Sequence, residues 1–353
     1  MEKTASLPAG VATSGDSQVL PASRIKSLDA LKGIAILAVI FLHSPRHVES
    51  MSWPLQIFFQ LCRFGVPYFF LTAGFFFMRG WNRNPNPVAL ARRYAIRLTI
   101  PFFFWALFYA VIPPFVGGAP NGIGPEVLHH LLNMIRYPHH LLLTGYVYHL
   151  WFLSSLIQVT AIVWIAMRFG GIHIALLVGG LLYGVALLGG PYSQTLFGFH
   201  THFDMKNGPF VGTLFFALGA WLEPRRRNVP LAVGIVLLGI GLLTYLSEAA
   251  YLQSTFAQPM ISNNYLLGSI PFSLGTVLIA LARPNLGGIA AEVGVYSLGL
   301  YALHAYVIEV LMRLPYGRAF SDFPFLFSLL VFALSFAAIR LLSRIRWMRA
   351  LIM

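Results

Sequence analysis

Charged residues are scarce in this sequence. Only 10% of the 353 residues are charged and 58% are hydrophobic, whereas a soluble globular domain has about 25% charged residues. So few charged side chains do not cover a surface that faces water, and much of the surface must therefore face lipid. The composition excludes an ordinary soluble domain and predicts an all-α, polytopic integral membrane helix bundle of about ten transmembrane helices.

Cysteine is almost absent as well. The one cysteine, Cys62, excludes an intrachain disulfide and a cysteine-rich metal site. It lies in an apolar segment, which favours a buried thiol that packs as a small hydrophobic group. Two histidine pairs, at 129–130 and 139–140, lack a clear carboxylate or cysteine partner. We therefore expect no metal site.

The first 23 residues have few large apolar side chains. Residues 1–23 are rich in Ser, Ala, Gly and Pro and have no apolar core of a signal peptide, so we expect a disordered cytoplasmic tail. Residues 24–345 are predicted to form the membrane domain. Residues 346–353 are predicted to be a short basic cytoplasmic tail.

Ten apolar segments are predicted to be membrane spans. They lie near 28–45, 55–78, 94–116, 149–168, 172–190, 209–223, 229–247, 265–282, 294–313 and 323–343. The loops between them are alternately rich and poor in Lys and Arg, and cytoplasmic loops carry the excess of these residues. An even number of spans with both termini in the cytoplasm fits every loop. The net charge of +13 is therefore read as a topology signal and not as nucleic-acid binding.

The first span carries two ionisable side chains on one helix face. Lys32 and His43 are eleven residues apart, which at about 100° per residue is close to three full turns. They are separated by roughly 16 Å along the axis, with the cation near the cytoplasm and the imidazole towards the outside. Ionisable residues in a span are costly, so each is a functional candidate.

Other ionisable residues fall at the same two depths. The group near the depth of His43 consists of Arg63, His149, His304 and Glu309. The group near Lys32 consists of Arg92, Arg93 and Arg97. The alternative for the second group is that its side chains only snorkel to the interface or orient the helices.

This arrangement suits an anionic cytoplasmic donor of long reach, such as acyl-coenzyme A. Its phosphates would meet Lys and Arg side chains, and its thin arm would carry a thioester into the bundle. A histidine near neutral pH can take a proton from an attacking hydroxyl or can accept the acyl group itself. A proton-coupled transporter uses similar residues, so the residue types alone do not decide between the two.

Five segments resemble sequence motifs of a known protein family. The first is Ser27-Leu28-Asp29-Ala30-Leu31-Lys32-Gly33 with Leu42-His43, and the others are residues 65–76, 149–153, 215–219 and 296–304. In this order the chain resembles the acyltransferase-3 family of membrane acyltransferases over residues 24–343. The resemblance implies transfer of an acyl group, usually acetyl, from cytoplasmic acyl-CoA to an envelope glycan.

The resemblance also assigns residues. His43 matches the catalytic histidine of the family, and Lys32 stands where arginine is usual, which keeps the charge but loses the planar bidentate fork. Arg93 and Arg97 resemble the basic pair that enters the third helix, here with a spacing of four. Thr72 stands where serine is common.

We therefore expect a bacterial inner-membrane O-acetyltransferase for a cell-surface polysaccharide, an exopolysaccharide or its lipid-linked precursor. His43 would be the general base, and Lys32, Arg93 and Arg97 would bind acetyl-CoA, a co-substrate, with no bound cofactor. The residues expected at the acceptor or acyl site are Arg63, His149, Trp151, His304 and Glu309. Expected partners include membrane lipid and polysaccharide-biosynthesis machinery, but no nucleic acid. The alternatives are a transporter or exporter of a small solute or glycan, and a structural membrane partner in an exopolysaccharide complex.

Overall fold

The structure is a computed structural model that describes residues 24–45, 51–84, 86–112, 122–145, 147–228, 230–315 and 317–353. All regular elements in these ranges are helices, so the all-α expectation is confirmed for the described residues. The predicted tail, residues 1–23, lies outside them.

The described residues up to Gly189 form eight α-helices. They are α1 (Lys26–His43), α2 (Trp53–Cys62), α3 (Gly65–Trp81), α4 (Pro87–Val111), α5 (Ile123–Arg136), α6 (Pro138–Thr144), α7 (Trp151–Phe169) and α8 (Gly171–Gly189). The second half adds α9 (Gly212–Leu222), η1 (Glu223–Asn228), α10 (Leu231–Phe256), η2 (Met260–Ser262), α11 (Ser269–Ala282), α12 (Gly288–Val295), α13 (Ser297–Met312), η3 (Gly317–Asp322), α14 (Pro324–Leu342) and α15 (Arg349–Ile352).

The predicted spans coincide with these helices, but among the described residues fewer than ten qualify as candidate membrane spans. Six helical segments in these ranges, with α2 and α3 joined as one, are long and apolar enough to cross a membrane, and a seventh follows if α12 and α13, bent by 75°, form one span. Three predicted spans fall short for physical reasons. Helix α1 contains Lys26, Asp29 and Lys32, while α9 has 11 residues and α11 has 14. An 11-residue helix extends only about 17 Å, against an apolar bilayer core of about 30 Å.

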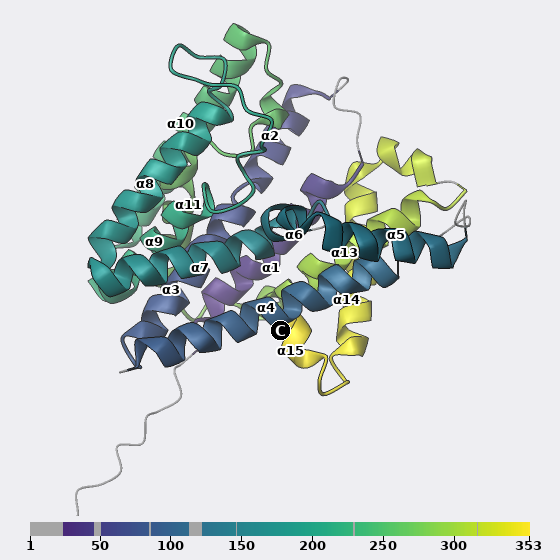
Figure 1. The fold of residues 1–353 in the computed structure, drawn as a ribbon. Helices are drawn as coiled ribbons and strands as arrows, with labels where there is room; N and C mark the ends of the chain where they lie inside the picture. The colour runs from purple at the N-terminus through teal and green to yellow at the C-terminus, as the bar shows by residue number, and fades with distance from the viewer. Residues whose placement is uncertain are drawn as a thin grey trace, which may run out of the picture.

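Helix α1 lies at the centre of the bundle. Figure 1 shows it (purple) between the teal and green helices of residues 151–282 and the yellow helices that follow residue 297. It contacts α2, α3, α11, α12, α13 and α14, and Leu28, Ala35 and Ile36 are fully buried. A helix with three charged residues is therefore shielded from lipid by its neighbours, which explains how it tolerates Lys32 and Asp29.

Two glycines allow α3 and α9 to touch backbone to backbone. A Cβ on Gly74 would lie 1.9 Å from the Phe216 carbonyl oxygen, and a Cβ on Gly219 would lie 1.9 Å from that of Leu71. No side chain fits at either position, so the pair fixes how closely these helices pack. Small residues serve this purpose between membrane helices, where lipid removes the usual hydrophobic drive for association.

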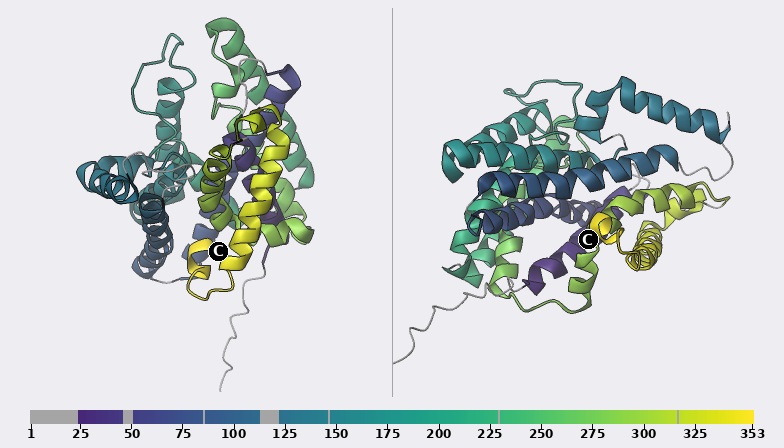
Figure 2. Two further views of the ribbon diagram at one scale, coloured as in Figure 1. Left: turned by 90° about the vertical axis from the view of Figure 1, so that its right-hand side faces the viewer. Right: turned by 60° about the horizontal axis from the view of Figure 1, so that its bottom comes forward.

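Two regions predicted as loop or tail are helical. Within the long loop predicted between the third and fourth spans, residues 123–136 and 138–144 form α5 and α6. Helix α5 has no buried residue, and both views in Figure 2 show α5 (blue) at the edge of the bundle. At the predicted tail, Leu351 and Ile352 of α15 are buried, and the Trp105 indole donates to the Leu351 carbonyl at 3.1 Å.

Loops with the same predicted membrane side contact one another. Asn82 donates to Glu223 at 3.1 Å, and the Ser27 amide donates to the Pro284 carbonyl at 3.2 Å. All four residues belong to segments that the charge pattern assigns to the cytoplasm. Each contact therefore brings two of these segments to the same end of the bundle.

Candidate active site

Three of the predicted histidines lie together. His43 is the last residue of α1, His149 precedes α7, and His304 lies in α13. The ring centroids of His43 and His304 are 5.1 Å apart and those of His149 and His304 are 5.5 Å apart. His149 and His304 are almost completely buried, at 1% and 0% exposure, while His43 is half-buried. We call these three residues the histidine cluster.

The hydrogen-bond partners assign the protons on two of these rings. His304 Nδ1 lies 3.1 Å and 2.7 Å from the carbonyl oxygens of Leu300 and Tyr301. A carbonyl only accepts, so Nδ1 carries the proton and Nε2 of the neutral ring accepts. His43 Nδ1 lies 2.9 Å from the Val39 carbonyl oxygen and 3.4 Å from His304 Nε2. Both partners are acceptors, so His43 Nδ1 donates and its Nε2 is the basic nitrogen of the neutral ring.

Tyrosine side chains and one carbonyl hold His149. Its Nε2 donates to the Ala302 carbonyl at 3.3 Å, which also accepts from the Tyr109 hydroxyl at 2.8 Å. The Tyr301 hydroxyl donates to the His149 carbonyl. His149 Nδ1 is buried and has no hydrogen-bond partner among the described residues. An unpartnered buried acceptor is costly, so His149 offers a nitrogen that a substrate proton can satisfy.

Tyr148 borders the histidine cluster, and the Glu309 carboxylate lies near Tyr148. The Tyr148 ring centroid is 5.7 Å from that of His43. Burial and the nearby Glu309 carboxylate raise the pKa of Tyr148 to about 12. Glu309 lies 3.8 Å from the Arg313 guanidinium, and both side chains are partly exposed. Tyr148 therefore stays a neutral hydrogen-bonding group beside His43 across the physiological pH range.

Lys32 belongs to a charged group at the opposite end of α1. Its ammonium lies 3.0 Å from Asp29 and 5.0 Å from the centroid of the Phe76 ring. Asp29 also pairs with Arg24, whose guanidinium donates to the Ala291 carbonyl at 2.8 Å. Two cations share one carboxylate, so one positive charge remains to attract an anion. Arg24 is not among the predicted site residues, because it stands before the first span and is typical of an orientation signal.

Arg93 and Arg97 are exposed on the first half of α4. Between them, Tyr94 packs on Phe77 of α3 with ring centroids 5.3 Å apart. Phe77 follows Phe76, the residue over which the Lys32 ammonium lies. The two arginines and Lys32 therefore border the same end of α3, although no hydrogen bond joins them among the described residues.

Among the described residues, no recorded hydrogen bond or ring contact joins Arg63 or Trp151 to the histidine rings. The Arg63 guanidinium donates to the Ile261 carbonyl and to the Asn264 side chain, so it holds the loop around η2. Trp151 is 9% exposed, and its ring packs against Phe152 with centroids 6.2 Å apart. Tyr109 and Tyr301, in contrast, contact the cluster directly, and sequence reasoning missed them because tyrosines and phenylalanines are common throughout the spans.

The five motif segments come together in two places. Residues 65–76 and 215–219 form the α3–α9 contact through Gly74 and Gly219. The remaining three segments contribute His43, His149 and His304 to the histidine cluster. Motifs that are spread over almost the whole chain thus form one helix–helix contact, between α3 and α9, and one polar site, the histidine cluster.

A comparison with protein families decides the family. The model of an acyltransferase domain, that of the acyltransferase-3 family, matches residues 25–344. The chain belongs to this family. It is therefore a membrane acyltransferase by family, which confirms the resemblance seen in its motifs.

Two curated relatives are similar over part of their length. A serine/alanine racemase of Enterococcus gallinarum is 25% identical over 299 residues, which cover 80% of this chain and 41% of the racemase. An amino-acid racemase of Enterococcus faecalis is 24% identical over 208 residues, which cover 56% of this chain and 28% of that protein. The chain thus spans less than half the length of either relative. No solved structure gives a significant match.

Proposed function

We propose that this acyltransferase-3 member is a bacterial inner-membrane O-acetyltransferase that modifies a cell-surface glycan or its lipid-linked precursor. The observation that supports this function best is the pairing of His43 Nδ1 with His304 Nε2 at 3.4 Å. This pairing leaves His43 Nε2 as a base, while the cations that suit a CoA donor lie at the other end of the same helix.

The chemistry is a single acyl transfer. A sugar hydroxyl oxygen attacks the thioester carbonyl carbon of acetyl-CoA while His43 Nε2 takes the hydroxyl proton. The tetrahedral intermediate then collapses, the carbon–sulfur bond breaks, and the proton on His43 passes to the departing thiolate. The products are the sugar acetate and free CoA. An acyl-His43 intermediate is the alternative route, with the same products.

His304 has the role of a positioning residue in this scheme. Its Nε2 accepts from His43 Nδ1, as the carboxylate does in a catalytic triad, and so keeps the basic nitrogen of His43 directed away from α13. Two carbonyls hold His304 in the matching tautomer. His149 Nδ1 is placed to accept a hydrogen bond from a neighbouring hydroxyl of the acceptor.

The donor would bind at the cytoplasmic end of α1. Arg24, Lys32, Arg93 and Arg97 supply positive charge there, and charge-assisted hydrogen bonds to phosphate are among the strongest available. The pantetheine arm would then follow α1 towards His43. In the proposed topology, both termini lie in the cytoplasm.

One structural feature favours a second candidate, a transporter. Helices α12 and α13 are bent by 75° at a short break, and discontinuous helices are common at transporter binding sites. The break lies in the motif segment 296–304 that carries His304. A transporter would move its substrate without consuming acetyl-CoA.

The racemase relatives do not change the proposal. They are named for racemization of serine, alanine or other amino acids, but the chain covers only 41% and 28% of their lengths. Their named activity is therefore not carried over to this chain. An amino-acid hydroxyl, such as that of serine, is a simple alternative acceptor to include beside the glycans.

The first test uses inverted membrane vesicles with matched amounts of wild type, His43→Ala and His173→Ala. His173 is an exposed histidine in α8 and serves as the control. With radiolabelled acetyl-CoA and an envelope-glycan extract, we expect label in the glycan fraction for wild type and His173→Ala. Removal of the base should reduce it by at least about a hundredfold in His43→Ala. Equal labelling in all three would remove His43 from the mechanism, and no labelling in any would favour the transporter.

A further inference from the structure

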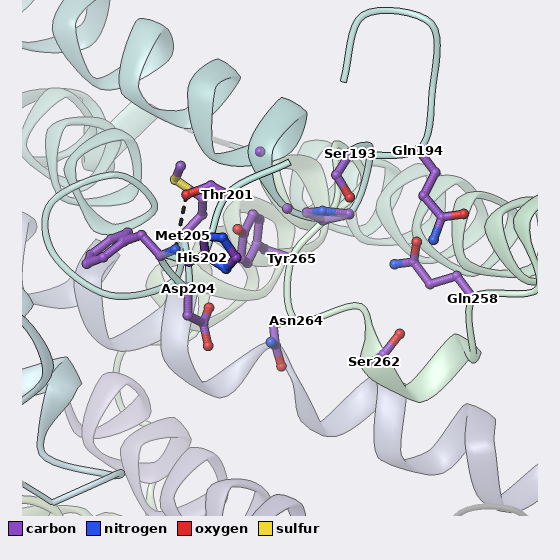
Figure 3. Close-up of a pocket in the computed structure, with 14 residues that line it drawn as sticks. Ser193, Gln194, Thr201, His202, Asp204, Met205, Gln258, Ser262, Asn264 and Tyr265 are labelled. Atoms are coloured by element: carbon purple, nitrogen blue, oxygen red, sulfur yellow. Dashed lines mark hydrogen bonds between the residues drawn. The ribbon is translucent and has the colours of Figure 1, made fainter. Parts of the chain in front are cut away.

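A second site lies outside the histidine cluster. A pocket of about 430 Å³ opens between the segment that follows α8 and the segment around η2. Figure 3 shows its polar side chains, with the amides of Gln194 and Gln258 facing one another. Its size lies in the usual range for small-molecule sites, but those sites are mostly apolar, and this one is not.

The lining selects for hydroxyl groups. It contains four side-chain hydroxyls and three amides, from Ser193, Thr201, Ser262, Tyr265, Gln194, Gln258 and Asn264. Such groups both donate and accept, as sugar hydroxyls do. None of the fourteen described lining residues is Lys or Arg, and Asp204 at the wall pairs with Lys206. The pocket therefore lacks the cationic groups that bind phosphate or carboxylate.

Part of the lining is available to a ligand. Among the described residues, no hydrogen bond holds the side chains of Ser193, Gln194 or His202, and Gln194 and His202 are exposed. The opposite wall is held in place, because Arg63 donates to Asn264 and to the Ile261 carbonyl. A fixed wall facing unengaged polar groups is a preformed binding surface, which lowers the entropic cost of binding.

Two contacts connect the pocket with the histidine cluster. Ile261 packs in one apolar cluster with Phe41, two residues before His43. The Ser155 hydroxyl donates to the Gly208 carbonyl, which anchors the loop that carries Thr201 and His202 to the start of α7, just after His149. Both pocket segments are also assigned to the outer side by the charge pattern, the side on which α1 ends at His43.

We propose that this pocket binds a neutral sugar unit of the acceptor and so delivers the glycan to the outer side of the histidine cluster. Its role in acyl transfer rests on the proposed function. Sugar binding itself rests on the pocket alone, and the two are tested separately. Arg63, predicted as an acceptor-site residue, acts here by holding the wall that contains Asn264.

The experiment measures binding without catalysis. The purified full chain in lipid nanodiscs is titrated with tritiated maltotriose and chitotriose, two neutral trisaccharides, and with trigalacturonate as an anionic probe. We expect saturable binding of at least one neutral probe and none of the anionic one. Loss of one or two hydrogen bonds should raise the Kd by about three- to tenfold or more in His202→Ala and in the double variant Gln194→Ala, Gln258→Ala.

Matched controls separate the site from the fold. His200→Ala changes an exposed histidine of the same loop that does not line the pocket, and it should bind like wild type. His43→Ala should also bind normally while losing acetyl transfer. Normal binding in the pocket variants, preferential binding of trigalacturonate, or no binding of either neutral probe would overturn the proposal. Pocket-dependent sugar binding without any acetyl transfer would retain the pocket and reject the acetyltransferase.

Discussion

At the scale of single residues, the hydrogen-bond partners of each histidine ring determine which of its nitrogens is basic. His43, His149 and His304 have the same side chain, but their backbone acceptors differ, so His43 and His304 donate from Nδ1 whereas His149 donates from Nε2. His43 presents Nε2 as its basic atom, whereas His149 presents Nδ1. One polar site thus offers two acceptors of different orientation, which suits a substrate with neighbouring hydroxyls.

The positioning role of His304 leads to a test with two variants. His304→Leu removes the acceptor for His43 Nδ1 and should lower kcat by about tenfold, the equivalent of one orienting hydrogen bond, with the KM for acetyl-CoA unchanged. His304→Gln retains a carbonyl that can accept and should recover most of kcat. Steady-state acetyl transfer as a function of pH checks this, since the pH profile should move in the Leu variant only.

A purely structural His304 would behave differently. Both variants would then lose activity in proportion to the loss of folded protein, and the pH profile of the remaining activity would match wild type. Size-exclusion chromatography of each purified variant provides the measure of folded protein.

At the scale of helices, close packing against neighbours can stabilise a helix that is too short to cross a bilayer. Helix α9 is too short to cross a bilayer, yet almost all its residues are buried. Its contact with α3 depends on Gly74 and Gly219, where a Cβ would collide with a backbone carbonyl. A short helix can therefore be stable inside the bundle because its neighbours, and not lipid, satisfy its surface.

This contact predicts opposite effects for two glycine substitutions. Gly219→Ala should lower the free energy of unfolding by about 1–3 kcal/mol, because the added methyl group forces α3 and α9 apart. Gly184→Ala, in α8, places its methyl group in open space and should be neutral or stabilising by up to about 1 kcal/mol from helix propensity. Thermal unfolding in detergent, followed by tryptophan fluorescence, measures the difference. Equal melting temperatures would contradict the close-contact role of Gly219.

At the scale of the whole molecule, the fold has polar sites towards both ends of α1. The charged group of Arg24, Asp29 and Lys32 lies at its start, and the histidine cluster and the sugar pocket lie towards its end. A reaction that takes a donor from one side of the membrane and an acceptor from the other needs this arrangement. The predicted orientation of the chain assigns the start of α1 to the cytoplasmic side and its end to the outer side.

Cysteine labelling tests that orientation. In a Cys62→Ser background, Leu196→Cys and Leu286→Cys each place one thiol at a position that is 90% or 65% exposed. We expect a membrane-impermeant maleimide to label the first in intact spheroplasts and the second only after permeabilization. Labelling of both in intact spheroplasts, or the reverse pattern, would reject the topology. The parent Cys62→Ser chain gives the background.

The sequence by itself determined the class of the protein and the positions of most helices. Hydropathy is a local property, and a backbone in lipid must satisfy its hydrogen bonds within the segment, so apolar runs predict helices directly. The same logic marked Lys32, His43 and His304 as costly residues and therefore as functional candidates. It failed for residues 123–144, where Pro, Gly and polar side chains indicate a loop but two helices form.

Only the tertiary structure decided which of these residues meet. His43 and His304 are separated by 261 positions in the chain, and no local pattern states that their rings touch or that Arg63 turns towards the η2 loop. The sugar pocket likewise exists only where two distant loops face each other. The physical reason is that such contacts depend on how the helices pack, through positions such as Gly74 and Gly219, and packing is a property of the whole bundle.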